Sequence, residues 1–395
     1  MAAVADDSQS PREPSPVPAD LGPAALAMME DHWRAEGYTC PSAEVYPWQW
    51  LWDSCFHTVI WAEAGDDRAL VELETIFAGQ DRVSGFVPHM GYQRDPGHDA
   101  VFWGRRGWSS LTQPPMYGHA VVELVERGLV VPDRLVEAAC SGVRFLLDAR
   151  RRSPAGLVEL AHPWESGADD SARWDDLVGG PAVSAAARRT RKGDLLAAVT
   201  RDADGSPLAN DHFAVGSVAF SALVAFNAAE LARHTGDPDL AGRAAELAAS
   251  VAERWDDGVG TWIDDGPTAA GSGRARTAEV LCALLVDPRP DGFSQLIDAD
   301  AFAGRCGPTG VHRAEATYSG SGYWRGPSWP QLDYLLWLAA RRAGEPDVAA
   351  SVGSGLIAGA AASGFAEYWN ADTGAPGGAV PQSWTALAWV VQQAG

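Results

Sequence analysis

Apolar residues recur at spacings of three and four along most of this chain, which is the pattern of an amphipathic α-helix. The spacing predicts helices over eleven segments, and no series of alternating strands is evident. The predicted segments are Ala24–Glu36, Phe56–Ala64, Ala69–Ala78, Gly118–Arg127, Asp133–Ala149, Phe213–Arg233, Leu240–Trp255, Thr277–Leu285, Pro330–Arg342, Val348–Ala362 and Trp384–Gln392. The sequence therefore predicts an all-α protein.

A connection of similar sequence recurs between predicted helices, at residues 62–69, 234–241 and 342–349. In each copy, a glycine can take the left-handed conformation that ends a helix. In the second and third copies, Asp237 and Glu345 are expected to cap the next helix, whose first turn begins with proline. Each copy predicts two antiparallel helices joined by a short loop. About twelve such helices predict a closed α/α toroid around one central cavity.

The 395 residues are sufficient for one large ring of helical hairpins. Residues 1–20 hold proline, serine and acids without an apolar run, which predicts a disordered tail rather than a signal peptide. Residues 21–395 are then expected to form one domain, with an irregular insertion around residues 175–212. We interpret the charged stretch at 188–194 as a solvated insertion, with a lid as the alternative.

A formal net charge of −22 argues against nucleic acid and anionic membranes as partners, because both require basic surfaces. Lys192 is the only lysine. The sequence contains no run of 18 apolar residues, so no membrane span is predicted. The five cysteines are dispersed without CxxC spacing, which favours free thiols in a reducing cytoplasm and indicates no metal site.

The segment from His162 to Ser171 holds three carboxylates, a tryptophan and a glycine, with no apolar period. Burying a carboxylate is costly unless it is paired, so we expect these acids to line a polar cleft. Residues 364–374 offer a candidate partner acid, Glu367, among aromatic residues and glycines. Two carboxylates facing each other across a sugar are the usual means of cleaving a glycosidic bond. The seventeen tryptophans, many beside polar residues, suit the apolar face of a sugar.

The segment from Tyr46 to His57 resembles the opening motif of glycoside hydrolase family 63, with the bacterial mannosylglycerate and glucosylglycerate hydrolases most similar. Further matching segments follow in the same order at residues 85–90, 164–171, 323–330, 367–369 and 382–385. The resemblance spans roughly residues 44–390, although the chain is short for the family and residues 181–211 match nothing. It implies an (α/α)6 barrel and an inverting mechanism without an organic cofactor.

Carried onto this sequence, the resemblance implies that Asp169 is the general acid and Glu367 the general base. From the residues alone, Asp170 remains an alternative to Asp169, and an Asp-Asp-Ser run could instead cap a helix. Asp53 is expected to bind sugar hydroxyls, with capping of a helix that starts at Ser54 as the alternative. The residues expected to bind the sugar are Tyr46, Trp50, Trp52, Asp53, His89, Gln113, Trp164, Gly167, Tyr323, Trp324, Trp329 and Gln382.

The predicted function is inverting hydrolysis of a small α-glycoside such as glucosylglycerate or mannosylglycerate. A substrate carboxylate needs a local cation in so acidic a protein, and the arginines placed near these motifs are candidates. They are Arg94, Arg105, Arg106 and Arg173, whereas Arg325 is expected to form a structural ion pair. The alternatives on the same fold are an α-glucosidase or trehalase-like hydrolase of a neutral oligosaccharide, a sugar epimerase or lyase, and a non-catalytic sugar-binding protein.

Overall fold

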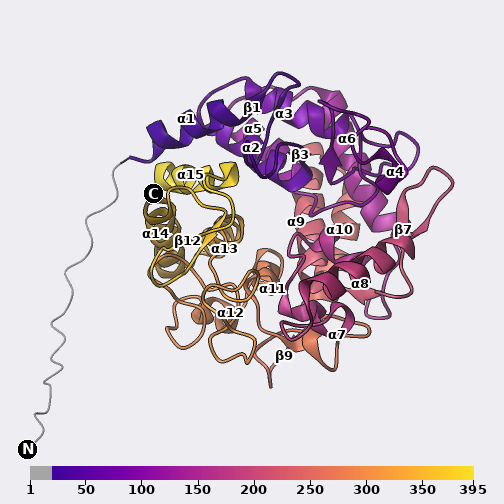
Figure 1. Cartoon of the computed structure of the whole chain (residues 1–395). Coiled ribbons are helices and arrows are strands. Elements are labelled where there is room, and N and C mark those ends of the chain that lie inside the picture. Colours follow the sequence, from indigo (N-terminus) through magenta and orange to yellow (C-terminus); the bar gives the residue numbers. More distant parts are fainter. Residues whose placement is uncertain (1–19) are drawn as a thin grey trace, which may run out of the picture.

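The computed structural model describes residues 20–395, so the predicted tail lies, except for its last residue, outside the described residues. Six helical segments form an inner ring in which each contacts the next, and the last contacts the first. In ring order they are α2 (Leu51–Glu63), α5 (Tyr117–Glu126), α9 (Val218–Thr235), α11 (Ala278–Leu281) with η5 (Cys282–Leu285), α13 (Pro330–Ala343), and η6 (Ser383–Ala386) with α15 (Leu387–Ala394). The predicted toroid of helices is confirmed (Figure 1).

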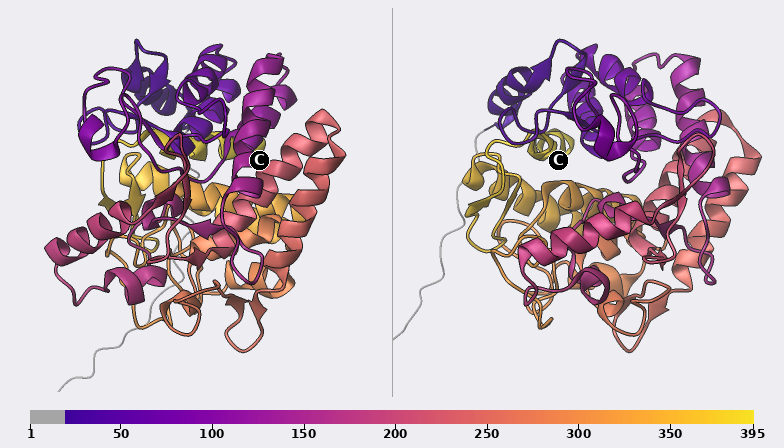
Figure 2. Two further views of the ribbon diagram at one scale, coloured as in Figure 1. Left: turned by 90° about the vertical axis from the view of Figure 1, so that its right-hand side faces the viewer. Right: turned by 45° about the vertical axis from the view of Figure 1, so that its right-hand side comes forward.

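A second set of helices surrounds this ring, and each alternates along the chain with an inner segment (Figure 2). The outer helices are α1 (Gly22–His32), α3 (Arg68–Phe77), α6 (Asp133–Arg144) with η1 (Phe145–Ala149), α10 (Pro238–Ala252), α12 (Pro290–Gln295) and α14 (Pro346–Ser363). Helix α1 packs against η6, so the first described helix contacts the last inner segment. This arrangement is an (α/α)6 barrel.

The inner and outer helices differ in how much of their surface is buried. Every residue of α2 from Leu51 to Ala62 is buried, because an inner helix is covered on all sides. In α10 the buried residues are Leu240, Ala244, Leu247 and Val251, which form a single stripe along one face. The apolar inner ring therefore provides the core, and the outer helices present polar faces to solvent.

The loops between hairpins carry the remaining elements, which are short except for α8. The helices among them are α4 (Ala100–Trp103), α7 (Asp175–Val178), α8 (Ala185–Ala197), η2 (Pro163–Ser166), η3 (Ala172–Trp174) and η4 (Ser272–Arg274). The strands form antiparallel pairs, namely β1 (Trp33–Arg34) with β2 (Tyr38–Thr39), β3 (Gln49–Trp50) with β4 (Met90–Gly91), β5 (Glu159–Leu160) with β8 (Val215–Gly216), β6 (Thr200–Arg201) with β7 (Pro207–Ala209), β9 (Trp255–Asp256) with β10 (Thr261–Trp262), and β11 (Tyr368–Trp369) with β12 (Pro376–Gly377). Within residues 20–395, no helix is both long and apolar enough to span a membrane.

The predicted connections are partly confirmed. Gly236 ends α9 with φ 71°, and Asp237 accepts hydrogen bonds from the backbone N–H groups of Asp239 and Leu240 at the start of α10. Gly344 ends α13 in the same way, with φ 77°, but the side chain of Glu345 makes no capping hydrogen bond. The prediction of a cap at Glu345 is therefore wrong, and proline alone marks the start of α14.

Candidate active site

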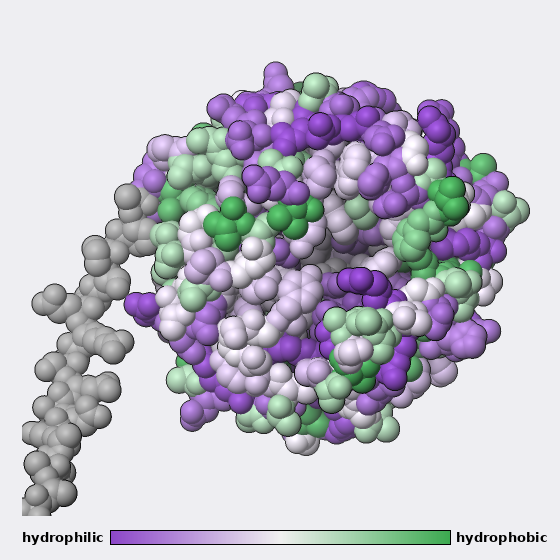
Figure 3. Space-filling view, in the orientation of Figure 1, coloured by the Kyte–Doolittle hydropathy of each residue, from purple (hydrophilic) through white to green (hydrophobic). Residues whose placement is uncertain are grey.

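A cavity of about 430 Å³ opens at the end of the barrel where the inner helices begin, within the range typical of small-molecule sites, about 300–1,000 Å³. All fourteen residues expected to act on or bind the sugar line this cavity. They are Tyr46, Trp50, Trp52, Asp53, His89, Gln113, Trp164, Gly167, Asp169, Tyr323, Trp324, Trp329, Glu367 and Gln382. The space-filling view shows a hollow in the middle of this face of the ring (Figure 3).

The loop that carries Asp169 is held in place by its neighbours in the chain. Gly167 has φ 75° and packs against Trp52, and a Cβ atom there would lie 2.6 Å from the indole ring. A glycine is therefore required both by the left-handed backbone and by the close approach. The capping side chain of η3 is Ser171, whose hydroxyl accepts from the N–H of Arg173, so capping is the role of the serine and not of the adjacent aspartates.

Asp169 is the one acid of this segment that lines the cavity, which corrects the expectation that all three line a cleft. Asp170 pairs with Lys192 outside the cavity lining, and Glu165 does not enter the cavity. Its carboxylate is fully buried and receives two hydrogen bonds from the Arg150 guanidinium, at 2.8 and 2.7 Å, and one from the N–H of Ala161. Although burial opposes ionisation, Arg150 holds the pKa of Glu165 below its ordinary value. This ion pair anchors the start of the loop that carries Asp169.

Arg173 anchors the other side of the same loop. Its side chain is fully buried and donates from Nε to Asp264 at 2.9 Å, with further contacts to Asp264 and Glu279. Arg173 is therefore a structural residue, and the suggestion that it could bind a substrate carboxylate is wrong. Arg325 pairs with Asp175 through two hydrogen bonds of 2.7 Å, as expected of a structural ion-pair partner.

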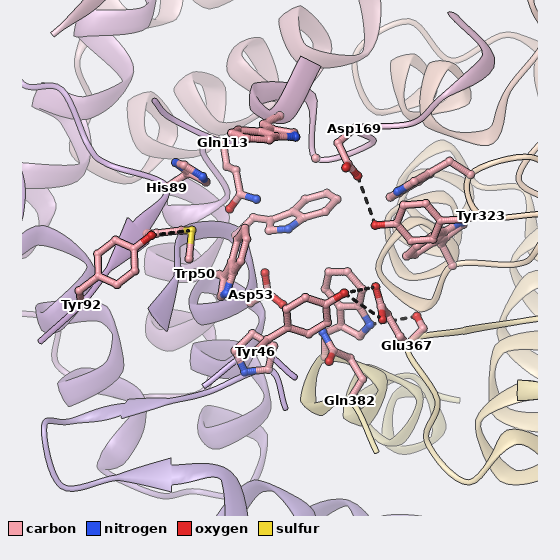
Figure 4. Close-up of a pocket in the computed structure, with 18 of the residues that line it drawn as sticks. Tyr46, Trp50, Asp53, His89, Tyr92, Gln113, Asp169, Tyr323, Glu367 and Gln382 are labelled. Atoms are coloured by element: carbon pink, nitrogen blue, oxygen red, sulfur yellow. Dashed lines mark hydrogen bonds between the residues drawn. The ribbon is translucent and has the colours of Figure 1, made fainter. Parts of the chain in front are cut away.

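Asp169 enters the cavity between a phenol and an ammonium group. Its Oδ1 lies 3.3 Å from the Tyr323 hydroxyl (Figure 4). Its Oδ2 lies 3.4 Å from Nζ of Lys192. Burial raises the pKa of the Asp169 carboxyl group, Lys192 lowers it, and the neighbouring Asp170 raises it again. The net upward shift favours a carboxyl group that can hold a proton.

Glu367 lies in the loop between α14 and η6 and faces the same cavity. Its Oε2 accepts from the backbone N–H of Ala379 at 2.9 Å, and the Tyr46 hydroxyl lies 3.4 Å from both carboxylate oxygens. Gly378, with φ 69°, leaves room for the carboxylate that a Cβ atom would occupy. Burial raises the pKa of Glu367 to about 7, the two hydrogen bonds oppose this shift, and Asp169 adds to it.

Asp53 is buried in the first turn of α2, which begins at Leu51, so the alternative of a helix cap before Ser54 is wrong. Burial raises the pKa of Asp53 well above its ordinary value, and the nearby charge of Glu367 acts in the same direction. His89 is buried as well, with Nδ1 2.7 Å from the Ser109 hydroxyl. Burial lowers its pKa to about 4, so its imidazole is neutral at physiological pH.

Aromatic rings form much of the cavity wall. Trp324 and Trp329 stack in parallel with ring centroids 3.7 Å apart, and Tyr323 packs edge-on against Trp329 at 5.5 Å. Trp52 meets Trp384 edge-on at 5.7 Å. Such rings cover the C–H face of a sugar while polar groups take its hydroxyls.

Several buried polar atoms of the cavity residues have no hydrogen-bond partner within the described part of the chain. These atoms are Nε1 of Trp50, Trp324 and Trp329, and Oε1 of Gln113 and Gln382. An unsatisfied buried donor or acceptor costs about 1–3 kcal/mol. The set offers both donors and acceptors, which is what recognition of sugar hydroxyl groups requires.

The charged residues that line the cavity are all acidic: Asp53, Asp99, Asp169 and Glu367. Arg94, Arg105 and Arg106 are not among the lining residues. Lys192 on α8 contacts Asp169 at the edge of the cavity, although it lies in the stretch that we interpreted as solvated. Sequence reasoning did not assign Lys192, Asp99 or Phe102 to the site. Lys192 could have been singled out because it is the only lysine of the chain.

The described residues include no group of three or more histidine, cysteine, aspartate or glutamate side chains arranged to hold a metal ion. What the cavity does offer is a pair of carboxyl groups from distant segments, each beside a tyrosine hydroxyl. Both have pKa values raised mainly by burial. This chemistry suits proton transfer to and from a bound sugar.

Known proteins resemble this chain along nearly its whole length. The mannosylglycerate hydrolase MGH1-like glycoside hydrolase domain matches residues 46–385. The glucosylglycerate hydrolase of Mycolicibacterium hassiacum is 27% identical over 96% of this chain and 98% of that protein. The mannosylglycerate hydrolase of Rubrobacter radiotolerans is 28% identical over 93% of this chain and 95% of that protein.

A solved structure supports the same assignment of the fold. The family 63 mannosylglycerate hydrolase of Thermus thermophilus superimposes with a TM-score of 0.82 at 24% identity, covering 94% of this chain and 100% of that one. The family match covers well over half of the chain and includes both segments that supply the two carboxyl groups. The protein is therefore a glycoside hydrolase and belongs to the mannosylglycerate hydrolase MGH1-like family.

Proposed function

We propose that this enzyme hydrolyses a small α-glycoside with inversion, using Asp169 as the general acid and Glu367 as the general base. The observation that carries this proposal is that both carboxyl groups line one cavity walled by tryptophan rings. Asp169 protonates the departing glycosidic oxygen, and Glu367 removes a proton from the water that attacks the opposite face of the sugar. Family membership favours this chemistry over the epimerase, lyase and non-catalytic alternatives.

The remaining cavity residues position the sugar between Asp169 and Glu367. Trp50, Trp52 and the stacked pair Trp324 and Trp329 enclose its apolar faces. Asp53, Gln113 and Gln382 hydrogen-bond to its hydroxyls, which satisfies the unpartnered amide oxygens. Such positioning lowers the entropic part of the barrier, since the reacting groups are already aligned when the substrate binds.

The substrates that we favour are glucosylglycerate and mannosylglycerate. The related proteins of Mycolicibacterium hassiacum and Rubrobacter radiotolerans carry the names of these two activities. The structure of the Thermus thermophilus relative has been solved with D-glycerate bound, and also with glucose bound. A cavity of about 430 Å³ suits a sugar with a small aglycone.

The stereochemistry of the product tests the mechanism. An inverting enzyme acting on an α-linked substrate releases the β-anomer first, because water attacks the face opposite the leaving group. Proton NMR of the anomeric region during the first minutes of hydrolysis is expected to show the β-sugar before mutarotation produces the α-form. Initial release of the α-anomer would indicate a retaining mechanism and would rule out the role proposed for Glu367.

A second candidate keeps the chemistry but changes the aglycone. The four charged residues lining the cavity are carboxylates, which favours a neutral leaving group, as in an α-glucosidase or a trehalase-like enzyme. The same NMR assay, run on glucosylglycerate, mannosylglycerate and trehalose at equal concentration, separates the two. A kcat/KM that is higher for trehalose than for both glycerate compounds would select the neutral substrate class.

Replacing Tyr46 with phenylalanine is expected to raise the pKa of Glu367 above about 7, because the phenol stabilises the charged carboxylate. Hydrogen bonds to charged groups contribute about 1.5–3 kcal/mol at good geometry, and these are long at 3.4 Å. The profile of kcat/KM against pH should therefore move to higher pH by about 0.5–1 unit. Tyr318→Phe, outside the cavity, is the control. A shift to lower pH would contradict this role of Tyr46.

A further inference from the structure

Lys192 places its ammonium group between two adjacent carboxylates. Nζ lies 2.7 Å from Oδ1 of Asp170 and 3.4 Å from Oδ2 of Asp169, and the lysine side chain is only 9% exposed. A lysine is seldom buried unless it is paired. The contact joins the only lysine of the chain to Asp169, whose carboxyl group lines the cavity.

Helix α8, which carries Lys192, is attached to the segment that leads into the Asp169 loop. Nε2 of His162 lies 3.0 Å from the carbonyl oxygen of Lys192. The side-chain amide of Asn210 donates both to the carbonyl of Leu195 on α8, at 2.8 Å, and to the carbonyl of Ala161, at 2.7 Å. Since these groups are buried, the ammonium group and the acid loop are held as one unit.

We propose that Lys192 and Asp170 act as a positioning pair for Asp169, fixing which of its oxygens carries the transferable proton and the pH at which that proton is held. This inference rests on the proposed role of Asp169 as the general acid. An ammonium group has only donors, so the oxygen it contacts, Oδ2, must accept. The proton of a neutral Asp169 is then left on Oδ1, the oxygen nearer Tyr323.

The charges around Asp169 explain why both Lys192 and Asp170 are needed to set its protonation. Lys192 favours the ionised form, whereas Asp170 in the same loop and Glu367 across the cavity favour the protonated form. The hydroxyls of Tyr323 and Tyr46 are titratable groups that also lie near Asp169. Asp170 is the closer partner of the ammonium group, so it offsets much of the positive charge that would otherwise keep Asp169 ionised.

Three substitutions test the pair through the dependence of kcat/KM on pH. Lys192→Met removes the cation and should raise the pKa of Asp169, which shifts the profile to higher pH by about one unit or more. Asp170→Asn removes the like charge and frees the cation, so the profile should shift to lower pH. Lys192→Arg keeps the charge and should remain within a few tenths of a unit of wild type. Asp169 and Glu367 titrate as a coupled pair, so either limb of the profile can report Asp169. The expected directions are the same for both limbs.

Opposite shifts in Lys192→Met and Asp170→Asn are the expected result, since a purely structural contact would change the rate without moving the profile in two directions. Shifts of the same sign, or none, would overturn the inference. Melting curves of the three variants identify any that fail to fold. If Lys192→Met fails to fold, the two variants that preserve side-chain bulk still decide between the outcomes. A shift to lower pH in Asp170→Asn, with Lys192→Arg close to wild type, supports the inference, and its absence in Asp170→Asn overturns it.

A substrate that needs no protonation separates this inference from the proposed function. Fluoride departs from α-glucosyl fluoride without a general acid, so Asp169→Asn should lose much more turnover on an alkyl α-glucoside than on the fluoride. Equal losses on both substrates would refute Asp169 as the acid, and the inference with it. If Asp169→Asn behaves as expected but the two shifts do not appear, the proposed function stands and the positioning pair fails.

Discussion

Replacing Glu367 with alanine, or Asp169 with asparagine, is expected to lower kcat on an alkyl α-glycoside by about 10²–10⁴-fold, the usual contribution of one general acid or base. Alanine leaves no carboxylate to activate water at position 367. Asparagine keeps the shape of Asp169 but cannot supply a proton to the departing oxygen. These two effects should be the largest of any single changes in the cavity.

The control is Asp372→Asn, which removes a carboxylate from the same loop as Glu367. Asp372 is half exposed, pairs with Arg313 and does not line the cavity. Its replacement should leave kcat within about twofold of wild type, because exposed pairs contribute about 0–1 kcal/mol. Initial rates followed by NMR, together with melting curves, distinguish lost chemistry from lost folding. Turnover in the Asp169 and Glu367 variants close to that of the control would contradict the acid and base assignments.

Removing the cation of the buried ion pair between Arg150 and Glu165, at the start of the loop that carries Asp169, should have the largest effect on stability. Arg150→Met leaves the fully buried carboxylate of Glu165 without its guanidinium partner. Breaking a buried pair in this way costs about 3–5 kcal/mol. We expect a lower melting temperature and a lower midpoint in urea, together with reduced activity, because Glu165 lies four residues before Asp169.

The matched control is Arg134→Met, which breaks a pair with Glu74 in which both side chains are more than half exposed. Its cost should stay below about 1 kcal/mol. The pKa of Glu165 is lowered in the folded protein, so its stabilising contribution is present at neutral pH and is lost as the pH falls through that lowered value. The difference in stability between wild type and Arg150→Met should therefore shrink in acid. Equal destabilisation by the two arginine changes at neutral pH would contradict this account.

The inner helices could be predicted from the sequence because apolar residues recur in them at spacings of three and four, but their ends could not. The predicted helix Ala24–Glu36 ends at His32, since Trp33 and Arg34 pair with Tyr38 and Thr39 in a small hairpin. The predicted helix Phe213–Arg233 begins at Val218, because Ser217 caps it after a short strand. Local backbone pairing of this kind leaves little trace in the apolar spacing.

The cavity residues could be predicted because they lie in short motifs of tryptophan, glycine and acids that resemble a known family. The partners of charged residues could not. Glu165 and Asp169 lie in the same segment, yet one points into a buried ion pair and the other into the cavity. The partners of Lys192 and Arg173 are brought to them by the tertiary fold, from 22 and 91 residues away respectively. The spacing of residues along the chain does not predict such contacts.

The contact between Tyr46 and Glu367 joins positions 321 residues apart. Closing so long a loop is entropically costly and delays the contacts that depend on it. On the proposed role of Glu367, turnover therefore requires the closed ring, and an intermediate that has formed its helices without closing the ring is expected to be inactive. During refolding, regained turnover should lag behind the recovery of helical circular dichroism, which makes activity a stringent reporter of a completed native state.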